Sequence, residues 1–390
     1  MAVANAIEAG AFGERARALV PAIAARAAEA EALRRLPDAT VADLRAAGLH
    51  RMCQPRRFGG AETPLDVAVA TSATLAEGCA STAWVAGVWT DHQIIVGMYP
   101  DKAADDIWND DPDRVVSASL VPSGKGVRVT GGWRIAGKWG FVSGCDFADW
   151  FVLAVPLPPE HGGVSFLLVP RSDVVIEDNW HVMGLCATGS KNLVVEEAFV
   201  PDHRVMPVAL IRGGEAVRKR TGVPPLYRLP HNATVTYLLA APAIGVAQSL
   251  LDLHIATFGA GGRGGGAIAS LPTMQMHVAE AAAEIDAARL LAQRATSEAM
   301  AAMAAGRDLD MTTRARNRRD ETYLVTLCRR AVNRLFVAEG AHAMFNDGDA
   351  QRKFRDMQAI AGHVVLNWDI AGTTYGRVVF GLDLPPGTLI

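Results

Sequence analysis

The chain has 390 residues, of which half are apolar and a fifth are charged. At roughly 150 residues per domain, this length predicts about two or three domains with ample apolar material for their cores. Lysine and arginine number 38 against 41 acidic residues, so a net charge of −3 offers no electrostatic footprint for a nucleic-acid partner. Five cysteines without a CxxC pair indicate reduced thiols, as in a cytoplasmic protein, with no disulfide framework and no metal site.

The sequence shows no targeting or membrane segment. Residues 1–38 lack the basic stretch followed by an apolar stretch that marks a secretory signal. The run TYLLAAPAIGV at 236–246 is shorter than the roughly 18 apolar residues of a membrane span and contains a proline. We therefore expect a buried helix at 236–246 and no contact with a membrane.

Residues 1–112 form the first of three regions with different patterns. They are rich in Ala, Leu, Glu and Arg, and their apolar residues recur every three or four positions, which predicts helices. One helix is expected to open at Thr63-Pro64-Leu65 and to close at Glu77-Gly78. The pattern therefore predicts an N-terminal helical domain over 1–112.

Residues 113–208 change to a period of two. The sequence VRVTGGWRI at 127–135 predicts a hairpin with a glycine turn. Further strands are expected at 151–155, 164–169 and 192–200. Proline and glycine punctuate these runs at intervals that suit a small barrel or sandwich.

The helical pattern returns after residue 208 and lasts to the end of the chain. Long helices are expected at 274–304 and 320–338, and the glycine-rich segment 260–266 is expected to connect two helices. The pattern therefore predicts a mostly α protein with a central β domain. It also predicts a C-terminal helical-bundle domain over 209–390.

Two histidines are candidates for chemistry, although a lone histidine more often has a structural role. Asn367 follows His363 by four residues, so the two are expected to share one helical face and could hold a polar ligand. His92 stands among aromatic and polar residues in WTDHQ.

The segment KWGFVSG at 138–144 suits a flat ligand at a strand end. The backbone can approach closely at its glycines, and Ser143 could donate a hydrogen bond to a ring heteroatom; a twisted strand edge with a bulge is the alternative. The loop at 188–190 is similar. No P-loop, Rossmann fingerprint, HExxH or GxSxG motif is present.

The order of the regions and several segments resemble the acyl-CoA dehydrogenase fold. These segments are 127–144, 192–201 and 347–356. Two departures argue against a dehydrogenase. The loop that usually reads Thr-Glu-Pro and then Gly-Ser-Asp is replaced by SLVPSG at 119–124, and the proton-abstracting glutamate is replaced by Asp347. A base displaced by about 1 Å would be costly to the reaction.

The sequence is more similar to the oxygenase components of two-component flavin-dependent monooxygenases, which share that fold. The matching segments are 34–60, 78–88, 111–125, 139–150 and 355–369. The resemblance implies that reduced FMN or FAD comes from a separate NAD(P)H:flavin reductase. It also implies that O₂ is the co-substrate and that a C4a-hydroperoxyflavin hydroxylates a phenolic or polycyclic aromatic substrate. A homotetramer is the family's usual assembly.

The resemblance also implies roles for particular residues. Ser143 matches the serine near flavin N5, His363 matches a histidine beside the flavin C4a edge, and His92 matches a candidate base or anchor at the substrate. Four further residues are implied to line the flavin: Trp84, Ser117, Ser119 and Phe141. Three are implied near its phosphate end: Arg263, from the same or a neighbouring subunit, with Ala341 and His342. Tyr227 and Asn367 are expected at the substrate.

Three alternatives stay open. An oxygenase of the same fold could act on sulfur or amine nitrogen. A dehydrogenase would purify yellow with oxidised FAD and would be bleached by an acyl-CoA. A non-catalytic flavin-binding protein would show neither behaviour.

Overall fold

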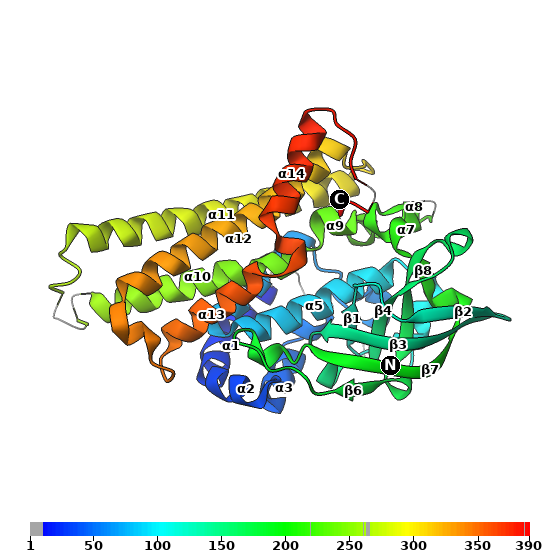
Figure 1. The fold of residues 1–390 in the computed structure, drawn as a ribbon, viewed down its shortest axis with the longest axis horizontal. Helices are drawn as coiled ribbons and strands as arrows, with labels where there is room; N and C mark the ends of the chain where they lie inside the picture. Colours follow the sequence, from blue (N-terminus) through cyan, green and yellow to red (C-terminus); the bar gives the residue numbers. More distant parts are fainter. Residues whose placement is uncertain (1–10, 219, 260, 263–265, 386) are drawn as a thin grey trace.

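The order helices, strands, helices extends over the whole molecule, as the sequence predicts (Figure 1). A computed structural model describes residues 11–390 except 219, 260, 263–265 and 386. The glycine-rich connector expected at 260–266 therefore lies mainly outside the described residues, and Arg263 lies outside them entirely.

The N-terminal region forms six α-helices within the described residues. They are α1 (Ala11–Ala25), α2 (Ala27–Leu33), α3 (Asp38–Ala46), α4 (Leu65–Gly78), α5 (Ala80–Gly97) and α6 (Asp101–Trp108). Helix α4 begins directly after Pro64 and ends at Gly78, as predicted. Every residue of α5 from Ala80 to Val96 is buried, so this helix runs through the interior and carries no solvent-facing side.

The β region consists of two four-stranded sheets. One has the order β1 (Val116–Ser119), β4 (Trp150–Pro156), β5 (Val164–Pro170) and β8 (Val205–Pro207). The other has the order β2 (Lys125–Val129), β3 (Gly132–Val142), β7 (Lys191–Pro201) and β6 (Val175–Glu177). β1 pairs with β4 in parallel and the other pairs are antiparallel. The predicted hairpin is β2–β3, with Val129 opposite Gly132.

Strand β4 is buried on both faces, which is how the β region joins the rest of the molecule. Phe151, Leu153 and Val155 pack with the second sheet in a core of its own. The alternate residues Val152 and Ala154 belong to the main helical core. The two sheets therefore form a sandwich whose first sheet lies against the helices.

The C-terminal region is again helical. Its short elements are α7 (Val208–Arg212), α8 (Glu215–Arg218) and α9 (His231–Thr234). Its long ones are α10 (Tyr237–Phe258), α11 (Pro272–Ala304), α12 (Met311–Ala338), α13 (Asp349–Ala361) and α14 (Trp368–Val379). Helix α12 begins nine residues before the predicted start at 320, because the Asp310 side chain caps it by accepting from the Thr313 amide at 2.7 Å.

Helix α10 is the buried helix predicted around 236–246. The segment His231–Phe258 is long and apolar enough to cross a membrane, but 72% of its most apolar window is buried inside the protein. Helix α10 packs against α4, α5, α11, α12 and α13. It is thus the central helix of a core that both helical regions share, and the expected boundaries after 112 and 208 stay predictions.

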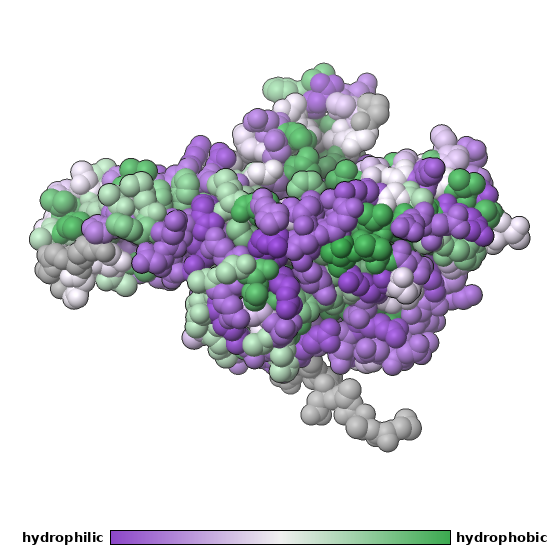
Figure 2. Space-filling view, turned by 60° about the horizontal axis from the view of Figure 1, so that its bottom comes forward, coloured by the Kyte–Doolittle hydropathy of each residue, from purple (hydrophilic) through white to green (hydrophobic). Residues whose placement is uncertain are grey.

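The face shown in Figure 2 is mostly hydrophilic, with apolar areas near the middle of the molecule and along the arm formed by the long helices. Exposed apolar side chains of the C-terminal region include Leu290 on α11, Val337 on α12 and Phe380 directly after α14, of which Phe380 is 81% exposed. Monomeric proteins seldom leave large apolar patches in water, so these positions are candidates for contacts between copies of the chain.

Candidate active site

A cavity of about 580 Å³ lies where α5, the first sheet and the C-terminal helices meet. Its volume falls in the range of roughly 300–1,000 Å³ that is usual for cofactor and ligand pockets. The lining is largely apolar, with a few polar side chains from α5, the end of β3, the loop at 180–190, α9, α12 and the turn after α13.

Helix α5 provides one wall of the cavity. Trp84, Val88, Asp91 and His92 line it, at intervals of four, seven and eight residues from the first. On an α-helix these positions fall on one face, so the cavity wall is a direct result of the helical period. Asp91 was not among the site residues named from the sequence. Its spacing of seven residues from Trp84 places it on the same helical face and could have indicated it.

The end of β3 provides another wall of the cavity, which meets α5 where Trp84 contacts Ser143. The register between β3 and β7 shifts between Trp139 and Val142, which marks a bulge. At the bulge Phe141 adopts a φ of 60°, lines the cavity and has a side chain that is largely exposed. A non-glycine residue in the left-handed region is strained, and such strain is often found at functional sites. Ser119 supports this wall, because its hydroxyl donates to the Gly140 carbonyl at 2.9 Å.

Ser143 follows β3 and takes part in a chain of hydrogen bonds. Trp84 Nε1 donates to Ser143 Oγ at 3.1 Å, Ser143 Oγ lies 2.7 Å from Ser190 Oγ, and Ser190 Oγ lies 2.7 Å from Thr188 Oγ1. Thr188 Oγ1 in turn donates to the Leu185 carbonyl at 2.8 Å. The loop at 188–190 therefore belongs to the site.

The donor in each of these hydrogen bonds can be worked out from the last one, in which Thr188 donates to the Leu185 carbonyl. A hydroxyl has one proton, and that of Thr188 is committed to a carbonyl, so Ser190 must donate to Thr188 and Ser143 must donate to Ser190. Ser143 keeps one lone pair for a ligand. Within this network Ser143 therefore offers an acceptor to a ring heteroatom, where the sequence led us to expect a donor.

His92 has a defined tautomer. Its Nδ1 lies 2.9 Å from the Val116 carbonyl, which can only accept, so Nδ1 carries a proton. Burial lowers the pKa of His92, although the charge of Asp91 opposes this shift. The ring is therefore neutral at neutral pH, with an unprotonated Nε2 that can accept a proton from a ligand.

His363 has the opposite tautomer. It caps the short 3₁₀ helix Val364–Leu366, because its Nδ1 accepts from the Val365 amide at 3.3 Å. Burial, followed by the charge of Arg318, lowers the pKa of His363 to about 4. The neutral ring therefore carries its proton on Nε2, and its centroid lies 5.4 Å from that of Trp84.

Asn367 does not share a helical face with His363, so that prediction is wrong. The chain leaves α13, forms the 3₁₀ turn and starts a new helix, which Asn367 caps by accepting from the Ile370 amide at 3.1 Å. Each of the two side chains satisfies the first free amides of a separate helix. Asn367 is exposed and is not among the residues that line the cavity.

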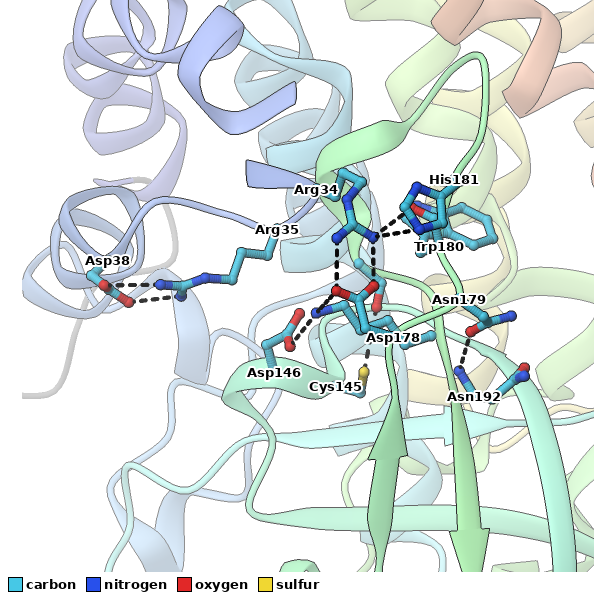
Figure 3. Close-up of polar contacts among 12 residues, drawn as sticks. Arg34, Arg35, Asp38, Cys145, Asp146, Asp178, Asn179, Trp180, His181 and Asn192 are labelled. Carbon is cyan, nitrogen blue, oxygen red and sulfur yellow. Dashed lines mark hydrogen bonds and ion pairs between the residues drawn. The ribbon is translucent and has the colours of Figure 1, made fainter. Parts of the chain in front are cut away.

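The loop that carries Trp180 is fixed by ion pairs (Figure 3). Arg34 donates to both carboxylate oxygens of Asp178, at 2.5 and 2.8 Å, and to the Trp180 carbonyl at 3.3 Å. Lys191 lies 2.7 Å from Asp146 and 3.9 Å from Asp178. The indole of Trp180 meets the ring of Phe141 edge-on at 6.0 Å, so both aromatic rings stand at the cavity.

Helix α13 holds the next part of the same loop. Arg355 donates to the Met183 carbonyl, and Asp356 accepts from the Leu185 amide at 2.7 Å. A Cβ on Gly184 would lie 2.3 Å from the Arg355 carbonyl oxygen, so only glycine allows this approach. The C-terminal helices therefore shape a loop of the β region.

Several expected site residues lie elsewhere. Ser117 is buried behind the wall and donates to the Ser143 carbonyl at 2.8 Å. Tyr227 is buried in the core, where its hydroxyl donates to the Cys53 carbonyl at 2.9 Å, and it does not line the cavity. Ala341 and His342 are exposed on the 3₁₀ segment between α12 and α13, outside the cavity of this chain.

Two buried ion pairs at the cavity were not expected. His231 Nε2 lies 2.6 Å from Asp91 Oδ1, and Arg318 contacts Glu321. Arg318 also donates to the Val365 carbonyl at 2.6 Å, and burial raises the pKa of Glu321 to about 7. Asp91 and His231 are 140 residues apart in the sequence, so no local pattern could pair them.

The cysteines do not contribute reactive groups. All five are free and buried, and burial raises the pKa of Cys145 to about 12 and that of Cys186 to about 11. Such thiols are poor nucleophiles at neutral pH. Within the described part of the chain, no three His, Cys, Asp or Glu side chains gather as metal ligands.

Comparison with known proteins defines the class. Residues 237–368 match the family "Acyl-CoA dehydrogenase, C-terminal domain". The FADH(2)-dependent resorcinol hydroxylase oxygenase component of Rhizobium sp. is 36% identical over 92% of this chain and 91% of its own length. The structure of 3-HSA hydroxylase from Rhodococcus sp. RHA1 matches with a TM-score of 0.92 and 31% identity over 100% of both chains. XiaF from Streptomyces sp., in complex with FADH2 and glycerol, matches with a TM-score of 0.90 and 29% identity over 97% of both chains.

The fold is thus that of the acyl-CoA dehydrogenases, with a central β-sandwich between helical regions. The chain belongs to the oxygenase components of flavin-dependent monooxygenases, which confirms the family expected from the sequence. It is accordingly an oxidoreductase that uses reduced flavin, as one component of a two-component system.

The cavity fits the ring system of a reduced flavin. A reduced flavin carries a proton on N5, and the lone pair that remains on Ser143 Oγ is an acceptor for such a proton. The exposed ring of Phe141 and the edge of Trp180 provide apolar surface for a flat ring. His363, which also lines the cavity, adds a donor through its Nε2–H.

Removing the Ser143 acceptor is expected to uncouple the enzyme. In Ser143→Ala, water replaces the fixed acceptor, so the share of flavin oxidation that ends as H₂O₂ should rise about 2- to 10-fold, the effect of one hydrogen bond. Thr188→Val should shift this share in the same direction but less. Without the Thr188 hydroxyl, Ser190 loses its acceptor and can donate to Ser143 instead, which weakens the constraint on the Ser143 proton. The measurement is H₂O₂ released per flavin oxidised. The matched control is Ser172→Ala, which removes an exposed hydroxyl outside the cavity. Unchanged H₂O₂ release in Ser143→Ala would remove Ser143 from this role.

Proposed function

We propose that this chain hydroxylates a phenolic or polycyclic aromatic ring, with O₂ as co-substrate and reduced flavin supplied by a separate NAD(P)H:flavin reductase. One observation carries the proposal. His92, whose Nε2 is unprotonated, lines the same cavity as Ser143 and His363. A base for the substrate and hydrogen-bonding groups for the flavin are thereby brought together.

The role proposed for each side chain follows from where its proton lies. When bound, reduced flavin would supply the two electrons that activate O₂, of which one atom enters the product and the other leaves as water. His92 Nε2 accepts the phenol proton, which makes the ring more nucleophilic. Ser143 holds the N5 proton, and the neutral His363 donates from Nε2. The apolar lining excludes water, which would otherwise divert reduced oxygen to H₂O₂.

The names of the relatives support an aromatic substrate. They include a resorcinol hydroxylase, a p-hydroxyphenylacetate 3-hydroxylase of Acinetobacter baumannii and an indole-3-acetate monooxygenase of Pseudomonas putida. Of the two flavins, FADH₂ is favoured over FMNH₂, because resorcinol hydroxylase and XiaF are named with it. A homotetramer in the cytoplasm completes the proposal, and the exposed apolar side chains of the C-terminal helices support self-association.

Stopped-flow oxidation of chemically reduced FMN and FAD by O₂, with a panel of phenols and product analysis, tests the function. Hydroxylated phenols, formed only with the protein present, are the expected result. Oxygenation of an added thioether or amine in place of phenols would indicate the S- or N-oxygenase. Bleaching of bound oxidised FAD by an acyl-CoA would indicate a dehydrogenase, and flavin binding without any product would indicate a carrier.

His363→Ala is expected to slow the reaction of bound reduced flavin with O₂ by about tenfold or more, because a neutral donor is lost at the flavin wall. Since the pKa of His363 is about 4, the wild-type rate should show no titration of this group between pH 6 and 8. Flavin absorbance after rapid mixing with O₂ measures the oxidation rate in the variant and the pH dependence of the wild-type rate. His363→Gln keeps a side-chain donor and should retain part of the rate. An unchanged rate in His363→Ala would remove it from the catalytic residues.

A further inference from the structure

Three polar residues gather on the cavity wall beside His92 and have no part in the steps above. Asp91 comes from α5, and His231 and Asn232 come from α9. His231 Nε2 lies 2.6 Å from Asp91 Oδ1, and His231 Nδ1 lies 3.1 Å from Asn232 Oδ1. Asp91 and His231 are almost fully buried, and all three residues line the cavity.

The protonation state of the cluster follows from its contacts. Burial works against the charge on both partners. Even so, the charge and hydrogen bond of Asp91 raise the pKa of His231, and the charge of His231 lowers the pKa of Asp91. Both contacts of the His231 ring are with acceptor oxygens, so both of its N–H groups donate, one to Asp91 and one to Asn232, and the ring is an imidazolium.

This state leaves two groups without protein partners. The carbonyl oxygen of the Asn232 side chain is fixed toward His231, so its amide nitrogen points away from the ring with two free protons. The second carboxylate oxygen of Asp91 has no hydrogen-bond partner within the described part of the chain. The cluster thus presents one donor group and one acceptor to the cavity, with no net charge.

A buried ion pair of this kind is weak evidence for a stabilising role. Taking two charges out of water costs free energy that their attraction often fails to recover, and apolar side chains would serve the core as well or better. An ion pair that lines a cavity and keeps a free acceptor beside a free donor is, by contrast, suited to hold a ligand group that both donates and accepts.

We propose that Asp91, His231 and Asn232 form a subsite for a second, uncharged hydroxyl of the aromatic substrate, separate from the hydroxyl that faces His92. A hydroxyl can donate to Asp91 and accept from Asn232 at once. A carboxylate cannot, because Asp91 repels it and the protons of His231 are already used. The substrate class is therefore a ring system with two hydroxyl groups. This inference rests on the proposed function.

A competing reading involves Arg212, which lines the same cavity and is partly buried, with no ion-pair partner in the described residues. If Arg212 selects the substrate, an aromatic acid should bind more tightly than a diol. The two readings predict opposite preferences, so a single panel of ligands separates them.

The test is calorimetric binding, without O₂, to the protein loaded with reduced flavin. The ligands are phenol, the three dihydroxybenzenes and 4-hydroxybenzoate. Wild-type protein is expected to bind at least one dihydroxybenzene about tenfold more tightly than phenol, as for one or two added hydrogen bonds. Asn232→Leu should reduce this preference to about twofold or less and leave phenol binding unchanged. Asn109→Leu, an exposed asparagine outside the cavity, is the matched control and should keep the preference.

Other outcomes contradict the subsite. Equal binding of phenol and all three diols by wild-type protein would overturn it, as would an equal loss for phenol and diols in Asn232→Leu. Tightest binding of 4-hydroxybenzoate, abolished in Arg212→Met, would assign specificity to Arg212 instead. If phenols are hydroxylated without any diol preference, the subsite alone fails. If no phenol binds or reacts, the proposed function fails and the subsite fails with it.

Discussion

His92→Ala is expected to lower aromatic hydroxylation by about 10²- to 10⁴-fold, the usual contribution of a positioned general base. The reaction of reduced flavin with O₂ should continue, so that electrons appear as H₂O₂ instead of product. The reason lies in the tautomer: Nδ1–H is bound to the Val116 carbonyl, and Nε2 is the free acceptor of a ring that lines the cavity. Alanine leaves the phenol proton without a base.

Product and H₂O₂ formed per flavin oxidised, measured in a single turnover, check this expectation. Burial lowers the pKa of His92, so the acidic limb of the hydroxylation profile should lie below the ordinary histidine value of 6.5 and should disappear in His92→Ala. His161→Ala is the matched control, since His161 is exposed on the β region outside the cavity. Loss of flavin oxidation itself in His92→Ala would instead place His92 at the flavin.

Arg318→Met is expected to produce the largest loss of stability, about 3–5 kcal/mol. Arg318 and Glu321 are buried on α12, and Arg318 also holds the Val365 carbonyl next to His363. Methionine fills a similar volume but leaves the carboxyl of Glu321 without its cation. The urea midpoint of unfolding measures the effect. Arg134→Met, which breaks an exposed pair with Glu197, should cost no more than about 1 kcal/mol.

The pH dependence of this loss has a definite sign. The pKa of Glu321 is about 7 in the folded protein against an ordinary 4.5, so the folded state binds the extra proton and stability falls as pH rises between these values. Without Arg318 the folded pKa rises further, so the loss in Arg318→Met should be larger at pH 8 than at pH 5. The double variant Arg318→Met with Glu321→Leu should recover most of the stability. A double variant no more stable than the single one would contradict the ion-pair explanation.

Local sequence determined the elements of this protein. The change from a 3.6-residue to a two-residue period and back gave the order of helices and sheets, and the glycines at 131 and 132 gave the β2–β3 hairpin. These features depend on neighbours within a few residues, whose conformational preferences act before any tertiary contact forms. The face of α5 that carries Trp84 and His92 also follows from the helical period alone.

Two expectations about site residues failed for different structural reasons. Asn367 stands four residues after His363, but a 3₁₀ turn and a new helix separate them, and each side chain caps its own element. Tyr227 comes from a segment near the cavity, yet it packs into the core beside Gly97, where a Cβ would lie 2.4 Å from its ring. Spacing alone could not show either outcome.

Only the tertiary structure decided how the site is assembled. It brings Ser143 beside Ser190, and Asp91 beside His231 across 140 residues. Those contacts fix the proton on Ser143 and the charge on His231, because a hydroxyl proton or an imidazole charge is set by the groups that surround it, and not by its own position in the chain. The sequence by itself therefore determined the face that α5 presents to the cavity, and the packing of distant segments determined the other walls and which atoms there can donate and which can accept.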